Sequence, residues 1–159
     1  MPLLPFGGMS DDDIIAVIAF LRSQPEVAST GPTGDDLNFL GMILFGAGLF
    51  PPAEVRPASI AAPAPGPNVQ YGKYVATFGE CRGCHGPDMT GSPATQFTTE
   101  VPNPRPLVST VTLAQFIEMM RTGVRPGNNP FPPQMPWQNA SKMTDDDLVA
   151  LYTYLTTEP

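Results

Sequence analysis

The chain has 159 residues, enough for one ordinary domain and a further segment. Its 21 prolines and 15 glycines argue against a long coiled coil or a large sheet and favour short helices joined by rigid loops. With 15 acidic and 8 basic residues, the net charge of −7 provides no basic surface for nucleic acid. The acidity favours a partner protein with a basic patch, or simply solubility.

Residues 10–24 form a predicted helix that has a counterpart near the other end of the chain. Met9–Leu21 and Met143–Leu155 align without a gap at an offset of 134 residues. Ser10 and Thr144 each precede three aspartates, the start signal of a capped helix, and apolar residues then recur every three or four positions. The first copy is apolar on nearly all sides. We expect it to pack on the second domain, to pair with another chain through residues 10–24, or to remain an exposed apolar surface.

Residues 29–67 combine a short apolar helix with a linker. Asp35 or Asp36 can cap a helix that runs from Leu37 to about Phe50. Its 14 residues are too few to span a bilayer, so we expect no transmembrane segment in this chain. Residues 51–67 are rich in proline and alanine, which is typical of a semi-rigid extended linker.

Residues 68–159 have the signals of a small unit of helices. Asn68 can cap a helix that runs to Phe78 and ends at Gly79. Thr112 and Gln115 have the spacing of a capping box for a helix that stops at Gly123. In that helix Met120 belongs to the apolar face, whereas Met119 favours packing or the surface. We expect irregular loops over 87–106 and 125–139 and no paired strands.

All the cysteine and histidine of the chain lies in Cys81-Arg82-Gly83-Cys84-His85. In this motif two thiols add to the vinyl groups of a haem, and the adjacent histidine binds the iron. A thioredoxin-like site would need alternating strands and helices, which are not apparent. A structural zinc site would need a fourth ligand. The motif therefore predicts one covalent haem c, held by Cys81 and Cys84, with His85 as the proximal iron ligand.

The sixth ligand is methionine, lysine, water or absent, because the chain has a single histidine. Met89 follows His85 too closely to reach the opposite face of a haem. Met135 lies between prolines that hold the loop extended, so we expect it to be the distal iron ligand, with core packing as the alternative. Trp137 can pack near a haem propionate or in the core.

Residues 68–159 resemble a class I c-type cytochrome. The resemblance rests on a helix with Tyr71-Gly72-Lys73-Tyr74, the Cys81–His85 motif followed by Gly86, Met135-Pro136-Trp137, and a terminal helix with aromatic residues. It implies an all-α fold of short helices around one haem. It further implies that Gly72 lets the first helix cross the last, against Tyr152 or a neighbour, and that a proline carbonyl, here Pro93, orients His85.

The N-terminal part resembles the end of a second such domain. By register, residues 1–28 correspond to a terminal helix, with Met1 at the axial-methionine position and 29–67 as the connection. The arrangement is similar to tandem dihaem cytochromes and to the cytochrome subunits of periplasmic dehydrogenases. We therefore expect a C-terminal part of a longer protein, whose signal peptide is absent from this chain, located in the periplasm or on the outer face of the inner membrane.

Two functions fit these features. The first is an electron carrier with His85 and Met135 on the iron, serving a dehydrogenase or another redox protein without being an enzyme itself. The second is a haem-based sensor or small-ligand binder, which needs a labile sixth site. The proline-bounded Met135 favours the carrier.

Overall fold

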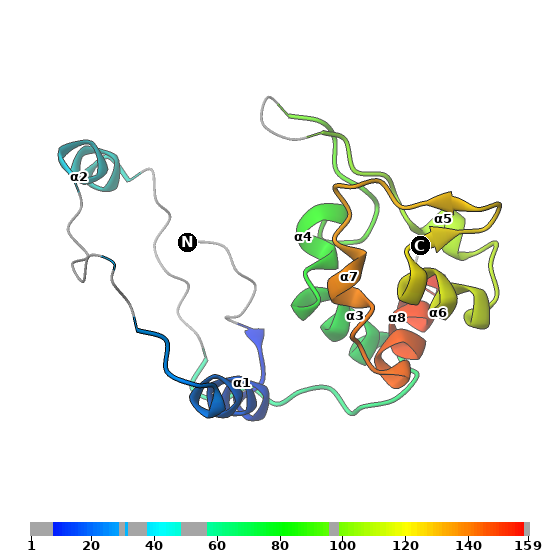
Figure 1. Ribbon diagram of the computed structural model, residues 1–159, viewed down its shortest axis with the longest axis horizontal. Helices are drawn as coiled ribbons and strands as arrows, with labels where there is room; N and C mark the ends of the chain where they lie inside the picture. Colours follow the sequence, from blue (N-terminus) through cyan, green and yellow to red (C-terminus); the bar gives the residue numbers. More distant parts are fainter. Residues whose placement is uncertain (1–7, 29–30, 32–37, 49–56, 96–98, 158–159) are drawn as a thin grey trace. The chain divides into compact units, whose positions relative to one another are not determined.

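The computed structural model describes residues 8–28, 31, 38–48, 57–95 and 99–157. It divides into two compact units, residues 1–61 and 62–159, which are treated separately below (Figure 1). Helices dominate the described parts of both units, which confirms the expected all-α fold. Within those parts, no helix is both long and apolar enough to cross a membrane.

The first unit contains the predicted helix with the triple-aspartate start. Helix α1 (Asp11–Ser23) begins after Ser10, whose hydroxyl accepts a 3.1 Å hydrogen bond from the Asp13 amide, as predicted. The Asp11 amide donates to the Ile60 carbonyl at 2.9 Å, which ties the helix to the linker. None of the α1 residues is buried, and its large apolar side chains other than Ile14 are exposed.

Helix α2 (Phe39–Gly46) is shorter than predicted. Its cap is Asn38, whose side-chain oxygen accepts a 2.8 Å hydrogen bond from the Gly41 amide. The predicted caps, Asp35 and Asp36, lie outside the described residues. An asparagine competes well for the cap position, so the helix begins after Asn38 rather than at Leu37.

The second unit holds the remaining elements. They are α3 (Val69–Phe78), α4 (Cys81–His85), α5 (Arg105–Val108), α6 (Leu113–Thr122), β1 (Val124–Arg125), β2 (Asn129–Pro130), α7 (Trp137–Ala140) and α8 (Asp145–Thr157). The predicted caps at Asn68, Thr112 and Thr144 are confirmed, and Gly123 ends α6 with a left-handed φ of 73°.

The two loops expected to be irregular contain short regular pieces. At the start of the second loop, strands β1 and β2 pair antiparallel. In the first loop, an isolated bridge joins Ser92 to Val101. The prediction of no paired strands was therefore wrong. Gly127, with a φ of +81°, lies between the two short strands, where a glycine adopts the turn at little cost.

Helices α3 and α8 cross at Gly72. A Cβ atom there would collide with the Ala150 carbonyl oxygen and would lie 2.7 Å from the Tyr154 Cβ. The predicted crossing is confirmed, and the facing residues are neighbours of Tyr152 rather than Tyr152 itself. Tyr152 points to another side of α8, where its hydroxyl donates to the Val111 carbonyl at 2.9 Å.

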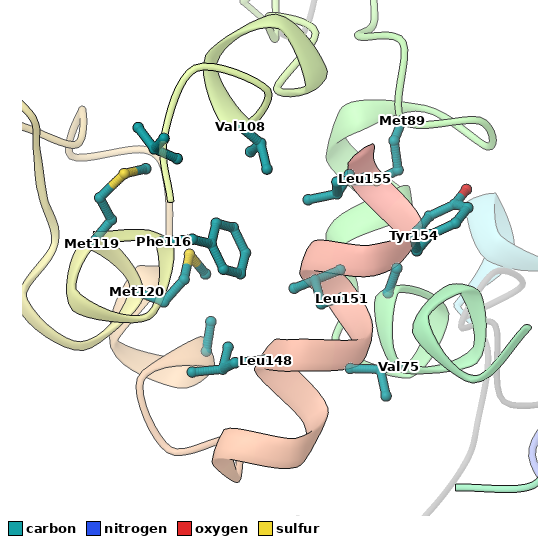
Figure 2. Packing of buried hydrophobic residues seen from close by; sticks show 13 residues of the cluster. Val75, Met89, Val108, Phe116, Met119, Met120, Leu148, Leu151, Tyr154 and Leu155 are labelled. Atoms are coloured by element: carbon teal, nitrogen blue, oxygen red, sulfur yellow. The ribbon is translucent and has the colours of Figure 1, made fainter. Parts of the chain in front are cut away.

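Helix α8 lies at the centre of the core. Figure 2 shows Phe116 and Met120 of α6 on one side of α8 and Val75 of α3 on the other. Met119 is only 3% exposed, so it packs in the core as Met120 does. The most buried large side chains, Tyr154, Leu148 and Leu151, all belong to α8. This packing supports α3 and hence the short helix α4 that follows it.

Candidate functional site

The Cys-x-x-Cys-His motif forms its own short helix, α4. Glu80, in the left-handed region with a φ of 61°, turns the chain out of α3 and into α4. Residues three and four apart share one face of a helix, so Cys81, Cys84 and His85 lie on a common side. Arg82 fixes this helix, because its guanidinium donates to the Thr77 hydroxyl at 2.7 Å and to the Pro87 carbonyl at 2.6 Å.

His85 makes a hydrogen bond that favours one tautomer of its ring. Its Nδ1 lies 2.8 Å from the Pro102 carbonyl oxygen. A carbonyl can only accept, so in the neutral imidazole Nδ1 carries the proton and Nε2 keeps its lone pair for a metal. The sequence prediction chose Pro93 for this contact, and the structure gives it to Pro102. The reason is topological: the Ser92–Val101 bridge folds the chain back and brings Pro102, rather than Pro93, over the imidazole.

Glycine allows the Pro102 segment to approach closely. The Gly91 amide donates to the His85 carbonyl at 2.8 Å. Gly91 has a φ of +93°, and a Cβ there would lie 2.8 Å from the Val101 carbonyl oxygen and 3.1 Å from the Pro102 carbonyl carbon. Any side chain at this position would therefore push the carbonyl away from the histidine.

The two cysteines lie in different environments. Cys84 is exposed, whereas Cys81 is partly exposed and packs against the hydrophobic core. Burial raises the pKa of the Cys81 thiol from 9.0 to about 11, with a smaller contribution from Cys84. The exposed Cys84 is thus directly accessible from solvent, whereas Cys81 is reached at the edge of the core.

The competing interpretations of the motif gain no support. Among the described residues, which include every cysteine and histidine, no group of three or more Cys, His, Asp and Glu side chains could hold a metal ion. A structural zinc site needs four such ligands. A thioredoxin-like site needs a sheet, and the named strands of the described residues are two residues long each.

The Met135 loop is ordered by its own backbone. The Met135 amide donates to the Pro132 carbonyl, and the Trp137 amide donates to the Met135 carbonyl, both at 2.9 Å. The Met135 side chain is partly buried and packs against the core. The Trp137 ring lies against Gly123, the residue that ends α6. The predicted roles of Met135 on the iron and of Trp137 at a haem stay predictions.

Two residues beside the motif were missed by the sequence analysis. Pro102 is one of several prolines in its loop. Only the bridge between Ser92 and Val101, which precedes Pro102, distinguishes it from the others. Arg105 is 6% exposed, and its guanidinium contacts the ends of two distant segments. A basic residue between prolines in a segment expected to be a loop indicates a surface position, so the sequence carried no signal of this burial.

Comparison with known proteins gives relatives of one kind. The chain is 34% identical to the cytochrome c subunit of alcohol dehydrogenase (quinone) from Gluconacetobacter polyoxogenes, over 97 residues that make up 54% of this chain and 21% of that protein. It is 30% identical to the fructose dehydrogenase cytochrome subunit of Gluconobacter japonicus, over 119 residues, 67% of this chain and 24% of that protein.

The chain thus matches about a quarter or less of the length of these relatives. No solved structure matches it significantly. The family model for cytochrome c matches residues 69–158, which is more than half of the sequence and contains α3, the Cys81–His85 motif and α8. On this match, and on the helix that presents two thiols and an oriented imidazole, the chain belongs to the cytochrome c family.

Proposed function

We propose that this chain transfers electrons through one haem c bound to α4. Cys81 and Cys84 hold the group by thioether bonds, and His85 binds its iron through Nε2. The haem supplies a one-electron iron couple. The observation that carries the proposal is the 2.8 Å contact between His85 Nδ1 and the Pro102 carbonyl, because it leaves the other ring nitrogen free to bind a metal.

We further propose Met135 as the distal ligand. Its backbone is fixed on both sides by the hydrogen bonds to Pro132 and Trp137, so the thioether is presented from an ordered loop. Three other methionines are 2–5% exposed and already fill the core: Met89, Met119 and Met120. A methionine ligand would raise the reduction potential and close the sixth site, which favours electron transfer over ligand binding.

The test is the near-infrared absorption of the oxidised, haem-loaded chain. We expect a weak iron–thioether charge-transfer band that disappears in Met135→Leu. Met119→Leu is the matched control, because both changes remove a sulfur and nearly conserve volume. A wild type without the band, or a band that survives Met135→Leu, would contradict Met135 as the ligand. Rapid binding of carbon monoxide by the reduced wild type would then favour the ligand-binding function.

The partner is proposed from charge and from the relatives. The net charge of −7 suits a donor or acceptor that presents a basic patch, and the relatives are cytochrome subunits of dehydrogenases. We propose that this chain relays electrons from a dehydrogenase to a respiratory acceptor on the periplasmic side of the membrane. Docking by charge predicts that the association rate with such a partner falls as salt is added.

We also propose that α1 is the terminal helix of a second cytochrome c domain. At the offset of 134 residues, Ala16 and Phe20 of α1 correspond to Ala150 and Tyr154 of α8. Ala150 and Tyr154 are fully buried where α3 crosses, whereas Phe20 is 64% exposed. Both helices therefore carry the residues that form the α3 contact in α8, but in α1 the side chain of Phe20 is not covered. The paired position of Met1 lies outside the described residues.

A further inference from the structure

Arg105 joins two parts of the second unit that lie far apart in the sequence. It is 6% exposed, and its Nη1 donates to the carbonyls of Tyr154 and Leu155 at 3.1 and 3.2 Å. Its Nε and Nη2 donate to the Asp88 carbonyl at 3.2 and 3.1 Å. The guanidinium carbon also lies 4.9 Å from the centroid of the Tyr154 ring. One buried cation thus connects the last turns of α8 with the loop after α4.

These partners suit a buried guanidinium. The carbonyls of a last helical turn carry the negative end of the helix dipole, and α8 offers two of them. Hydrogen bonds from a charged donor are about twice as strong as neutral ones, which offsets the cost of burying the charge. The planar fork reaches three carbonyls in two directions. A lysine ammonium in the same place is a point charge that cannot reproduce this geometry.

Arg105 also lies three residues after Pro102, whose carbonyl contacts His85. The Asn103 side chain accepts a 2.9 Å hydrogen bond from the Arg105 amide, which closes the turn between them. On the other side of Pro102, the bridge between Ser92 and Val101 holds the segment that leads into the turn. The Pro102 carbonyl therefore sits between one support made by the bridge and another made by the anchored guanidinium.

We propose that Arg105 is a positioning residue for His85, which it holds in its tautomer and orientation through the Pro102 carbonyl. The inference rests on the proposed function, in which His85 binds the haem iron. When the guanidinium is lost, the turn 102–105 loses its attachment to α8 and to Asp88. The Pro102 carbonyl is then free to move off Nδ1, and the hydrogen bond to the imidazole weakens.

The single histidine of the chain makes this bond directly observable. In the reduced, haem-loaded full chain with ¹⁵N-labelled histidine, the experiment measures how fast the Nδ1 proton of His85 exchanges with solvent. In Arg105→Met we expect exchange to be about tenfold faster, the factor for one ordinary hydrogen bond, and in Arg105→Lys an intermediate value.

Two control variants separate positioning from general stability and from charge. Thr112→Ala removes the cap of α6 and lowers stability at a distance from His85. Arg121→Met removes another cation, which binds the Ser141 carbonyl and Asp145. We expect the His85 proton to exchange at the wild-type rate in both controls.

Wild-type exchange in Arg105→Met, with stability lowered as in Thr112→Ala, would show a merely structural arginine and overturn the proposal. If Arg105→Met does not fold, Arg105→Lys decides in the same way: faster exchange than in the controls supports positioning, and equal exchange overturns it. Failure of the proposed function looks different, because the wild-type Nε2 resonance of His85 would then show no bond to iron.

Discussion

Tyr154 buries a hydroxyl that has no hydrogen-bond partner among the described residues. Two tyrosines of the same unit differ, because the Tyr71 hydroxyl donates to Asp147 and the Tyr152 hydroxyl donates to the Val111 carbonyl, both at 2.9 Å. A buried polar group without a partner costs free energy that a satisfied one does not. The ring of Tyr154, in contrast, fills the core and lies under Arg105.

Removing each hydroxyl separately should therefore give opposite results. We expect Tyr154→Phe to leave the free energy of unfolding unchanged or to raise it, whereas Tyr71→Phe and Tyr152→Phe each lower it by about 1 kcal/mol. Urea unfolding of the haem-loaded chain measures all three. A loss of about 1 kcal/mol or more in Tyr154→Phe would mean that the hydroxyl has a partner in the loaded protein.

Cys81 gives a pH-dependent prediction for the chain before haem attachment. Burial raises its pKa from 9.0 to about 11, so folding favours the neutral thiol. The associated stability is fully present below about pH 9 and is lost as the pH rises to about 11. At pH 8 the folded chain should hold about 100-fold less Cys81 thiolate than the unfolded chain.

Iodoacetamide labelling followed by mass spectrometry measures this difference. We expect Cys81 to react about 100-fold more slowly in the folded haem-free chain than in urea, with a rate that rises about tenfold per pH unit up to about pH 11. Cys84 is exposed and provides the internal control for access of the reagent. Equal labelling of Cys81 in both states would show that folding does not raise the pKa of this thiol.

At the scale of the elements, the α3–α8 crossing depends on one missing side chain. Gly72 brings the two backbones together at Ala150 and Tyr154, and a larger residue would have to separate the helices. We expect Gly72→Val to lower the free energy of unfolding by about 3 kcal/mol or more. Gly83→Ala in α4 is the control, because a Cβ there has nothing within 4 Å. Urea unfolding that treats both variants alike would contradict the tight crossing.

The structural elements also show which features can be predicted from the sequence and which cannot. Caps at Ser10, Asn68 and Thr112 were predicted because a cap is a contact between residues three apart. The covalent motif was predicted for the same reason, since its chemistry lies within five residues. Pro102 and Arg105 were missed, because their roles depend on contacts across 17 to 50 residues of sequence. Local patterns place the helices, and the support around His85 comes from the fold.

At the scale of the whole molecule, two helices with the same start signal and apolar pattern lie in different environments. In α8 the apolar face is covered by α3 and α6, whereas in α1 the corresponding side chains other than Ile14 are exposed. Leu155 is 4% exposed and Leu21, its partner at the offset of 134 residues, is 62% exposed. The two leucines therefore occupy equivalent positions in their helices, one buried and the other exposed.

Truncating the two leucines should separate these environments. Leu155→Ala removes buried methyl groups and should lower the free energy of unfolding of the haem-loaded unit by about 2–5 kcal/mol. Leu21→Ala should change it by less than about 0.5 kcal/mol, as is usual for an exposed position. Urea unfolding followed by haem absorbance reports on the second unit in both variants. A comparable loss in Leu21→Ala would mean that α1 is covered in solution, since only burial makes the truncation costly.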